Sequence, residues 1–321
     1  MRKTIGIWLC LVMIVAVLTS CAAQPATPTP ETEPVATADL PAPSQRVETD
    51  REGFPITLPE QIDAIISIGP SNTEVLVALG FGDLIIATDM FSEDIEGIHP
   101  GISVLDMMAL DLEFIVNAQP DIVFVTGMSR LSGDQDPLRL VTDAGISVIY
   151  MPSSASIAAI MEDILFMADV MDAQPAGLAI IAEMETEIER VRQISQAITE
   201  RRRVYFELSA APHMVSFGRG VFLHEMIELV GAENIFADQD SWISVSDEVV
   251  PAADPDVILT SVGYLDDPVG EILSRPGWGG MTAVANGSVF SIDTDSSNRP
   301  SHNIVIALQQ IAQAVYPEYF G

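Results

Sequence analysis

Short apolar runs alternate with amphipathic segments along the chain from about residue 54 onward. The first run, residues 64–69, is continuous, as in a buried strand, and residues 73–80 follow with apolar side chains at helical spacing. Glycine often closes a helix, so we expect this helix to end at Gly80. The same order continues through expected strands at 84–88, 121–125 and 147–151 and expected helices at 112–118 and 138–143. Strands and helices alternating at short spacing indicate βαβ units and a parallel sheet.

A second series of this kind follows one long helical stretch. The stretch covers residues 176–199, carries no strand signal, and ends at three consecutive arginines, which are favourable near the negative end of a helix dipole. After it come expected strands at 204–208, 257–260 and 289–292 and expected helices at 223–230 and 302–315. The long helix therefore separates two stretches of alternating strands and helices.

The two series echo each other. Residues 118–123 read Ala-Gln-Pro-Asp-Ile-Val and residues 253–258 read Ala-Asp-Pro-Asp-Val-Ile, each where a helix should give way to a strand. We predict an α/β fold with two Rossmann-like lobes, each with a central parallel sheet, joined by a single long α-helix and facing each other across a ligand cleft. The predicted ranges are 53–172 for the N-terminal lobe, 173–200 for the linking helix and 201–321 for the C-terminal lobe.

The first twenty residues have the pattern of an export signal. Residues 1–3 give a short positive start, and residues 5–18 form an apolar run too short to span a membrane comfortably. Residues 18–21, Leu-Thr-Ser-Cys, resemble a lipobox, which implies cleavage before Cys21, lipid on its thiol and stable anchoring. The alternative is a plain secretory signal, or an uncleaved anchor, in which Cys21 is incidental.

Residues 21–52 are dominated by proline, threonine, alanine and glutamate and show no apolar period. Such a segment cannot bury enough apolar surface to offset the entropy of ordering it, so we predict a disordered tether. Together with a lipoprotein signal at 1–20, the tether places the lobes outside the cytoplasm, at the cell surface or in a periplasm. The sequence does not distinguish which membrane carries the anchor.

Composition narrows the range of functions. The 46 acidic residues outnumber the 14 basic ones, the formal charge is −32, and the one lysine is Lys3, so nucleic-acid binding is excluded. Two cysteines cannot build a cysteine-based zinc site, and the four histidines share no metal-ligand spacing, so no metal site is expected. No nucleophile elbow, phosphate-binding loop or HExxH motif occurs, so nothing supports an exported enzyme.

Six short segments occur in a characteristic order: 69–74 (GPSNTE), 112–113 with 119–121 (LE…QPD), 231–236 (GAENIF), 255–258 (PDVI), 298–300 (NRP) and 316–320 (YPEYF). In this order the chain resembles the helical-backbone class of ABC-importer substrate-binding proteins, which capture ferric siderophores, haem or vitamin B12. The resemblance covers about residues 54–320. It implies a binding protein without a cofactor, whose ligand is a ferric siderophore, a corrinoid or haem. It also implies an ABC permease dimer with its ATPase as the partner.

Ligands of open α/β lobes sit beyond the carboxyl ends of the strands. Ser71 and Asn72 follow the first expected strand, and Ser71 with Glu74 has a capping-box pattern. This turn is therefore a helix cap, a ligand contact, or both. Other loops of the first lobe carry Met90, Phe91, Met108 and Met128. Methionine is often core filler, but its repeated occurrence in such loops favours a soft apolar wall for a large, flat ligand.

In the second lobe the matching edge carries Ser209, Trp242, Tyr264 and Arg299. Trp242 lies in a polar loop, which favours a ligand contact over a core role. Arg299 matches the arginine of the family's last cleft loop, whereas a second arginine usual there is replaced by residues 301–303, Ser-His-Asn. The scarcity of basic residues disfavours tricatecholate iron complexes. Neutral hydroxamate chelates, corrinoids and haem, through His302 or a methionine, are left open.

The resemblance further implies one glutamate on the outer surface of each lobe that pairs with permease arginines. Glu113, which precedes residues 119–121, and Glu225, which precedes residues 231–234, match by position. A solvated helix face is the alternative for both. The alternative function is a membrane-tethered sensory or co-receptor module of the same fold, and a working docking pair would favour transport over sensing.

Overall fold

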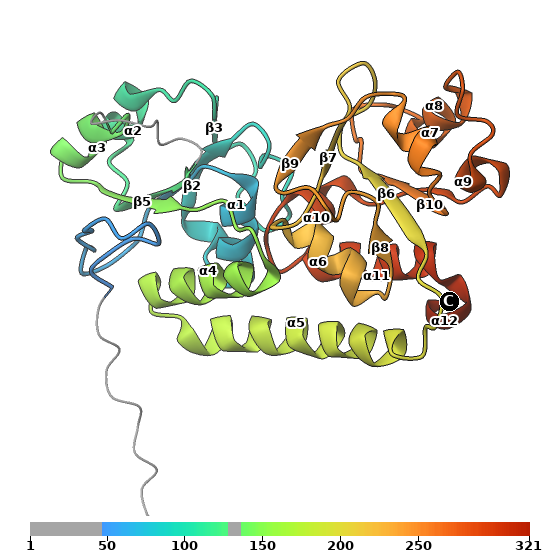
Figure 1. The fold of residues 1–321 in the computed structure, drawn as a ribbon. Coiled ribbons are helices and arrows are strands. Elements are labelled where there is room, and N and C mark those ends of the chain that lie inside the picture. Colours follow the sequence, from blue (N-terminus) through green and yellow to red (C-terminus); the bar gives the residue numbers. More distant parts are fainter. Residues whose placement is uncertain (1–46, 128–135) are drawn as a thin grey trace, which may run out of the picture. The chain divides into compact units, whose positions relative to one another are not determined.

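The computed structural model describes residues 47–127 and 136–321 (Figure 1). The expected signal, Cys21 and Met128 lie outside these described residues, as does most of the expected tether. Within the part of the chain that is described, no helix is both long enough and apolar enough to cross a membrane.

The last residues of the expected tether range are part of the first lobe. Thr49 forms a β-bridge with Pro55, and Arg51 pairs with two neighbouring carboxylates of one helix. The guanidinium Nε lies 2.6 Å from Asp163 Oδ1, and Nη2 lies 2.9 Å from Glu162 Oε2. The chain is therefore already fixed to the lobe at Arg51.

The first lobe is built on a five-stranded parallel sheet in the order β3-β2-β1-β4-β5. Its strands are β1 (Ile65–Ser67), β2 (Ile85–Asp89), β3 (Ser103–Leu105), β4 (Ile122–Thr126) and β5 (Ser147–Met151). The connecting helices are α1 (Pro70–Ala78), η1 (Gly82–Leu84), α2 (Leu112–Ala118) and α3 (Arg139–Asp143). Strands β1, β4 and β5 are almost wholly buried, as expected for a parallel sheet covered by helices.

The second lobe has a four-stranded parallel sheet in the order β11-β10-β6-β8 and a separate antiparallel pair, β7 with β9. The strands are β6 (Arg203–Glu207), β7 (Val215–Phe217), β8 (Glu233–Asn234), β9 (Trp242–Ser244), β10 (Val257–Thr260) and β11 (Val289–Ser291). The helices are α6 (Phe222–Leu229), α7 (Val249–Ala253), α8 (Pro268–Ser274), α9 (Thr282–Ala285), α10 (Thr294–Asn298), α11 (Ile304–Val315) and α12 (Pro317–Phe320). The predicted α/β fold with parallel sheets in two lobes is confirmed.

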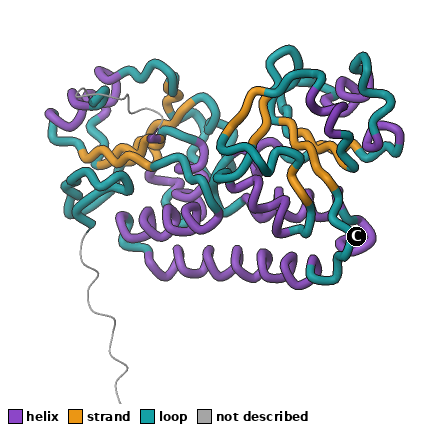
Figure 2. Tube along the Cα trace, in the orientation of Figure 1, coloured by secondary structure: helices purple, strands orange, loops and turns teal. Residues whose placement is uncertain are grey.

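Two helices, where the sequence analysis expects one, lie between the lobes. The predicted long helix is α5 (Gln174–Ser195), and it is preceded by α4 (Ile157–Val170), which the sequence analysis does not identify. Figures 1 and 2 show α4 lying along α5, and α5 running below both groups of strands. The Ser156 side chain accepts the Ala159 N–H and so caps α4 at its start.

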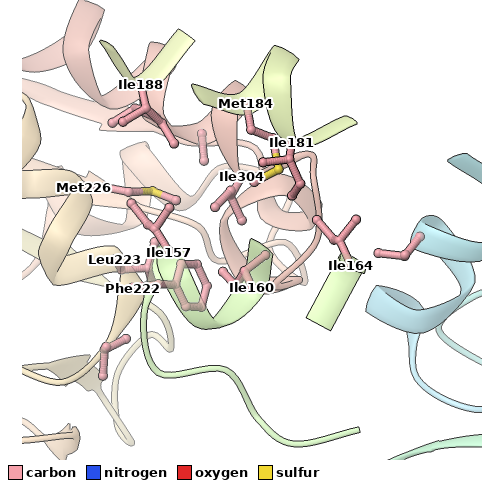
Figure 3. Close-up of a cluster of buried hydrophobic side chains, with 14 of the residues drawn as sticks. Ile157, Ile160, Ile164, Ile181, Met184, Ile188, Phe222, Leu223, Met226 and Ile304 are labelled. Carbon is pink, nitrogen blue, oxygen red and sulfur yellow. The ribbon is translucent and has the colours of Figure 1, made fainter. Parts of the chain in front are cut away.

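A single hydrophobic core joins the two lobes through these helices. Its members include residues of both sheets, and Figure 3 shows the part between the lobes. The labelled side chains there are Ile157, Ile160 and Ile164 of α4, Ile181, Met184 and Ile188 of α5, Phe222, Leu223 and Met226 of α6, and Ile304 of α11. Burial of a side chain of this size stabilises a fold by about 1.5–3 kcal/mol. Separating the lobes would expose this core, so the lobes resist wide opening.

The three arginines after α5 do not cap that helix, contrary to expectation, because α5 ends several residues earlier, at Ser195. Their guanidinium groups instead donate to backbone carbonyls at helix ends of the second lobe. Arg202 donates to Val315 at the end of α11, and Arg203 to Ala253 at the end of α7. Arg201 donates to the carbonyl of Ala232, just after α6. The basic cluster therefore ties three helices together.

The repeat seen in the sequence is a repeat in structure. Gln119 and Asp254 end α2 and α7 in the left-handed conformation, with φ of 49° and 46°. The Asp121 carboxylate then accepts backbone N–H groups just before β1, and the Asp256 carboxylate accepts the N–H of Arg203 at the start of β6. Each aspartate thus fastens its own strand to the neighbouring one.

Candidate ligand cleft and docking surface

A cavity of about 300 Å³ is lined by residues of both lobes. The first lobe contributes the turn from Gly69 to Asn72 together with Met107, and the second lobe contributes Phe222, Trp242, Asn298 and Pro300. The turn follows β1, so this wall lies where ligands of α/β lobes bind. Ser71, Asn72 and Trp242, which the sequence analysis assigns to the ligand, lie together in this lining.

The capping box predicted for Ser71 and Glu74 is absent from the start of α1. The N-cap residue is Gly69, with φ 112°, and no side chain caps the helix. A side chain at that φ would be strained, and Pro70 fits the first helical position because it has no N–H to leave unpaired. Asn72 is buried and donates to the carbonyl of Ile68. The half-buried Ser71 is left facing the cavity.

A buried aspartate shapes the loop that carries Met90 and Phe91. The Asp89 carboxylate accepts the N–H groups of Gly69 and Phe91, both at 2.8 Å, and the hydroxyl of Ser92 at 2.6 Å. The two apolar side chains next to it are not buried, and that of Phe91 is 50% exposed. Asp89 therefore fixes both the turn before α1 and the loop after β2.

Met108 is the most exposed large apolar side chain of the described residues, at 79%. Its N–H donates to the Asp106 carboxylate, which holds the turn after β3, and the neighbouring Met107 lines the cavity. A methionine this exposed is not core filler, so the alternative considered for these methionines does not apply to Met108.

Aromatic side chains of the second lobe are exposed in the same way. Trp242 on β9 is 53% exposed, lines the cavity and packs edge-to-face on the buried Phe217, with 6.2 Å between the ring centroids. Tyr264 is 67% exposed, and its hydroxyl lies 3.2 Å from Ser209 Oγ and 2.8 Å from the N–H of Ala210. Ser209 and Tyr264 thus lie together, but they are not in the lining of the cavity itself.

Arg299 is engaged within the fold. Its side chain is 18% exposed, and the guanidinium pairs with Glu74 at 2.9 Å and Asp295 at 2.7 Å and donates to the carbonyl of Phe91 at 3.1 Å. The residues on either side of it, Asn298 and Pro300, line the cavity. The expected ligand contact of Arg299 stays a prediction, and its guanidinium is not free in this structure.

One buried acid in the lining was missed by the sequence analysis, because it lies on the unidentified helix α4. Asp163 lines the cavity, and burial raises the pKa of its carboxyl above the ordinary value. Hydrogen bonds from Ser154 and Arg51 act in the opposite direction. Among the described residues, no group of three or more His, Cys, Asp or Glu side chains could hold a metal ion.

The two glutamates expected to dock with a permease differ in structure. Glu113 is exposed in the first turn of α2. Glu225 is half-buried in α6, and its Oε2 accepts the N–H of Ile157, at the start of α4, at 2.9 Å. A carboxylate at a helix N-terminus pairs with an otherwise unsatisfied N–H and with the positive end of the helix dipole. Glu225 is therefore engaged between the lobes.

Glu248 holds the place in the second lobe that Glu113 holds in the first. Glu113 precedes Asp121 by eight residues, and Glu248 precedes Asp256 by eight. Both glutamates are exposed at the start of the helix that leads to the repeated junction. The structural repeat thus makes Glu248, rather than Glu225, the counterpart of Glu113.

Comparison with known proteins extends these observations. A relative over the whole chain is the uncharacterised ABC transporter substrate-binding lipoprotein YvrC of Bacillus subtilis, 25% identical over an alignment that covers 100% of this chain and 99% of the relative. A cobalamin-binding protein of Halobacterium salinarum is 26% identical, covering 84% of this chain and 73% of the relative. A solved structure of a possible iron-binding periplasmic solute-binding protein from Staphylococcus epidermidis matches with a TM-score of 0.70 at 25% identity, covering 80% of this chain and 100% of the other.

These relatives are substrate-binding proteins and not enzymes, in agreement with the sequence analysis. A family model also matches the chain: residues 65–296 match the family described as periplasmic binding protein. This range contains both sheets and both helices between them. The resemblance to the substrate-binding proteins of ABC importers is confirmed, and the chain belongs to the periplasmic binding protein family.

Proposed function

We propose that this protein is the substrate-binding subunit of an ABC importer, anchored outside the cytoplasm by lipid on Cys21, and that it captures a metal chelate. The observation that carries the proposal is the exposed indole of Trp242 in the lining of a cavity formed by both lobes. Four more large apolar side chains are exposed on loops that follow strands, Met90, Phe91, Met108 and Tyr264, and Met108 lies next to Met107 of the lining. Exposed apolar groups at a cavity favour a ligand that covers them, and soft methionines with aromatic rings suit a broad, flat ligand.

The charge around the cleft bears on the class of chelate. Arg299, the basic residue expected there, already pairs with Glu74 and Asp295. A strongly anionic complex would find no free guanidinium at Arg299 and would be repelled by the net charge of the chain. Neutral or weakly charged ligands are therefore favoured, namely corrinoids, hydroxamate chelates and haem. The cobalamin-binding relative from Halobacterium salinarum favours a corrinoid among them.

The chain is well suited to a fluorescence test of this ligand class. Outside the expected signal it has two tryptophans, Trp242 at 53% exposure and Trp278, which is buried in the second lobe at 1%. Cyanocobalamin, haemin, ferrichrome and ferric enterobactin should be titrated separately against the protein. We expect saturable quenching by cyanocobalamin, and none by the anionic tricatecholate complex.

The matched variant for this titration is Trp242→Phe, which keeps an aromatic ring and leaves Trp278 as the reporter. Quenching should fall in this variant if the ligand covers Trp242. Quenching that is equal in the variant and the wild type would place the ligand away from Trp242. Absence of binding by all four compounds, in the titration and in equilibrium dialysis, would overturn the proposed ligand class.

We further propose that the partner is a permease dimer with its ATPase and that Glu113 and Glu248 are the docking pair. Both carboxylates are exposed, and they occupy equivalent positions in the two lobes. Charge-assisted pairs with arginines of a partner would fix the orientation of docking. Glu225 is a poorer candidate, because its carboxylate already accepts the Ile157 N–H.

Lipid anchoring is tested at Cys21. Cys21→Ala should leave the protein unprocessed or release it from membranes, because two or more acyl chains are needed for stable attachment. Cys10→Ala is the matched control, since Cys10 lies within the expected signal and should be removed with it. A cleaved, shortened Cys21→Ala species that still sediments with membranes would contradict lipid anchoring.

A further inference from the structure

A buried carboxylate of the first lobe is bound entirely by side chains of the second. Glu74, on α1, is 6% exposed. Its Oε1 accepts from Arg299 Nη1 at 2.9 Å, and its Oε2 accepts from Asn303 Nδ2 at 3.0 Å and from the hydroxyl of the fully buried Ser301. All three donors lie between α10 and α11, so one short segment of the second lobe surrounds the Glu74 carboxylate.

The same contacts continue to the turn that begins α1 and lines the cleft. Arg299 donates through Nη2 to the carbonyl of Phe91, and the N–H of Phe91 donates to Asp89. Asp89 also accepts the N–H of Gly69, in the turn that begins α1 and lines the cleft. The backbone of Phe91 is thus held from both sides, by an aspartate of its own lobe and by an arginine of the other.

Glu74 and Arg299 lie next to residues that line the cleft. Asn298 and Pro300, on either side of Arg299, line the cavity of about 300 Å³. Glu74 and Arg299 themselves line a second cavity, of about 360 Å³, that is also formed by both lobes. The pair therefore sits behind the cleft wall, where a change in the spacing of the lobes would pull it apart.

Energetics favour one spacing over others. A buried carboxylate that loses its cation and hydrogen bonds is left uncompensated, which is strongly unfavourable, whereas the intact arrangement satisfies it. The donors cannot follow Glu74 if the lobes separate, because they are fixed between two helices of the second lobe. The hydrogen-bonded arrangement around Glu74 is thus low in energy at one spacing of the lobes and unfavourable at any wider spacing.

We propose that Glu74 and Arg299 are positioning residues for the ligand: they hold the two lobes at one spacing and fix the backbone of Phe91, so that the cleft is preformed for a rigid chelate of matching thickness. The ligand class in this inference rests on the proposed function. The lobe spacing does not, since it is a property of the protein without ligand. A protein of this kind selects ligands by the fit of a fixed opening.

The test measures lobe spacing and binding separately. Spin labels at two exposed positions, Asn117 on α2 and Asn286 after α9, report the distance between the lobes by pulsed electron paramagnetic resonance. Cys10 and Cys21 are replaced by serine so that only these sites are labelled. The variant Glu74→Met with Arg299→Met removes both charges at similar volume, and Glu74→Gln keeps the shape and removes one charge. The control is Glu271→Gln, which weakens an ion pair confined to the second lobe.

Without ligand, the wild type and the Glu271→Gln control should give one narrow distance distribution, and both Glu74 variants a broad one. Cyanocobalamin should then bind the Glu74 variants about tenfold more weakly, since only a fraction of molecules would hold the competent spacing. Narrow, unchanged distributions in Glu74→Gln and in the double variant would overturn the proposal. Failure of the wild type to bind any chelate would instead overturn the proposed function, and the distance distributions would still decide the role of Glu74.

Discussion

Glu113 and Glu248 lie at the same step of two repeated helix-to-strand units, one in each lobe. Each glutamate precedes by eight residues the aspartate that fastens a parallel strand to its neighbour, Asp121 in the first lobe and Asp256 in the second. Both side chains are exposed. A symmetric partner with two equivalent subunits could therefore bind one glutamate carboxylate with each subunit. The proposed permease dimer would be such a partner.

The first prediction concerns this pair. Glu113→Ala combined with Glu248→Ala should leave ligand affinity unchanged but abolish uptake, or stimulated ATP hydrolysis, in a reconstituted transporter. Raising the salt concentration should reproduce part of the loss in the wild type, because exposed charge pairs are screened over about 8–10 Å at physiological ionic strength.

The matched control is Glu113→Ala combined with Glu225→Ala, which keeps Glu248. If this control loses as much transport as the Glu113 and Glu248 variant while its fold is intact, the assignment of Glu248 is wrong. Wild-type transport by the Glu113 and Glu248 variant would remove the whole docking surface from consideration.

The second prediction concerns Trp242 in the lining of the cleft. Trp242→Ala should weaken ligand binding by about 1–3 kcal/mol if the indole stacks on the ligand, as buried aromatic anchors do in other interfaces. Tyr319→Ala is the control, because Tyr319 is similarly exposed but lies on α12, outside the lining of the cleft. Calorimetric titration of both variants measures the effect. Equal dissociation constants for wild type and Trp242→Ala would assign Trp242 to packing on Phe217.

Much of the fold was predictable because its signals are local. The strand–helix alternation, the long helix α5 and the repeated junctions each show within a few residues of sequence. Helix α4 was equally predictable, since its buried positions Ile157, Ile160 and Ile164 recur at helical spacing after the capping Ser156, but the sequence analysis did not use that pattern. Asp163 lies on this helix and could have been predicted as a site residue along with it.

The site was harder to predict because its decisive contacts are not local. The residue type and sequence position of Arg299 suggest a ligand contact, yet its partner Glu74 lies 225 residues away in the chain. The residue type and sequence position of Glu225 suggest a docking residue, yet its carboxylate accepts the N–H of Ile157, 68 residues away. No local pattern reports such pairs. The exposed apolar residues were found because methionines in loops, and a tryptophan next to a polar run, are unusual in themselves. Trp242, expected in that polar loop, is in fact the first residue of β9.

The third prediction concerns the stability of the second lobe. Arg275 and Glu207 form a buried bidentate pair, with N–O distances of 2.7 and 2.8 Å, at 8% and 1% residue exposure. Arg275→Ala should destabilise the protein by about 3–5 kcal/mol, because it leaves the Glu207 carboxylate buried without its cation. Urea unfolding measures this, with Arg192→Ala as the control. The exposed Arg192–Glu189 pair should contribute far less to stability, because solvent screens it. Equal losses in the two variants would contradict the argument.

The fourth prediction concerns pH and His302. Burial lowers the pKa of His302 below its ordinary value of 6.5, against the opposing charges of Glu74 and Glu183. The unfolded chain therefore takes up a proton on this side chain at a higher pH than the folded chain does. The stability linked to His302 is present above the unfolded pKa and is lost as the pH falls toward the folded one. Stability should decline on acidification through this window.

The measurement compares thermal midpoints of the wild type and His302→Gln at about pH 7.5 and about pH 5.5, on either side of the ordinary histidine pKa. Asp163 and Asp295, whose pKa values are raised by burial, contribute the opposite slope at lower pH, but they are common to both proteins and cancel in the difference. The variant should therefore lose less stability than the wild type over this interval. His99→Gln is the control, because His99 is exposed and should leave the pH dependence of the wild type in place. A His302→Gln protein that follows the wild-type curve at both pH values would show that His302 does not carry the proton taken up on unfolding.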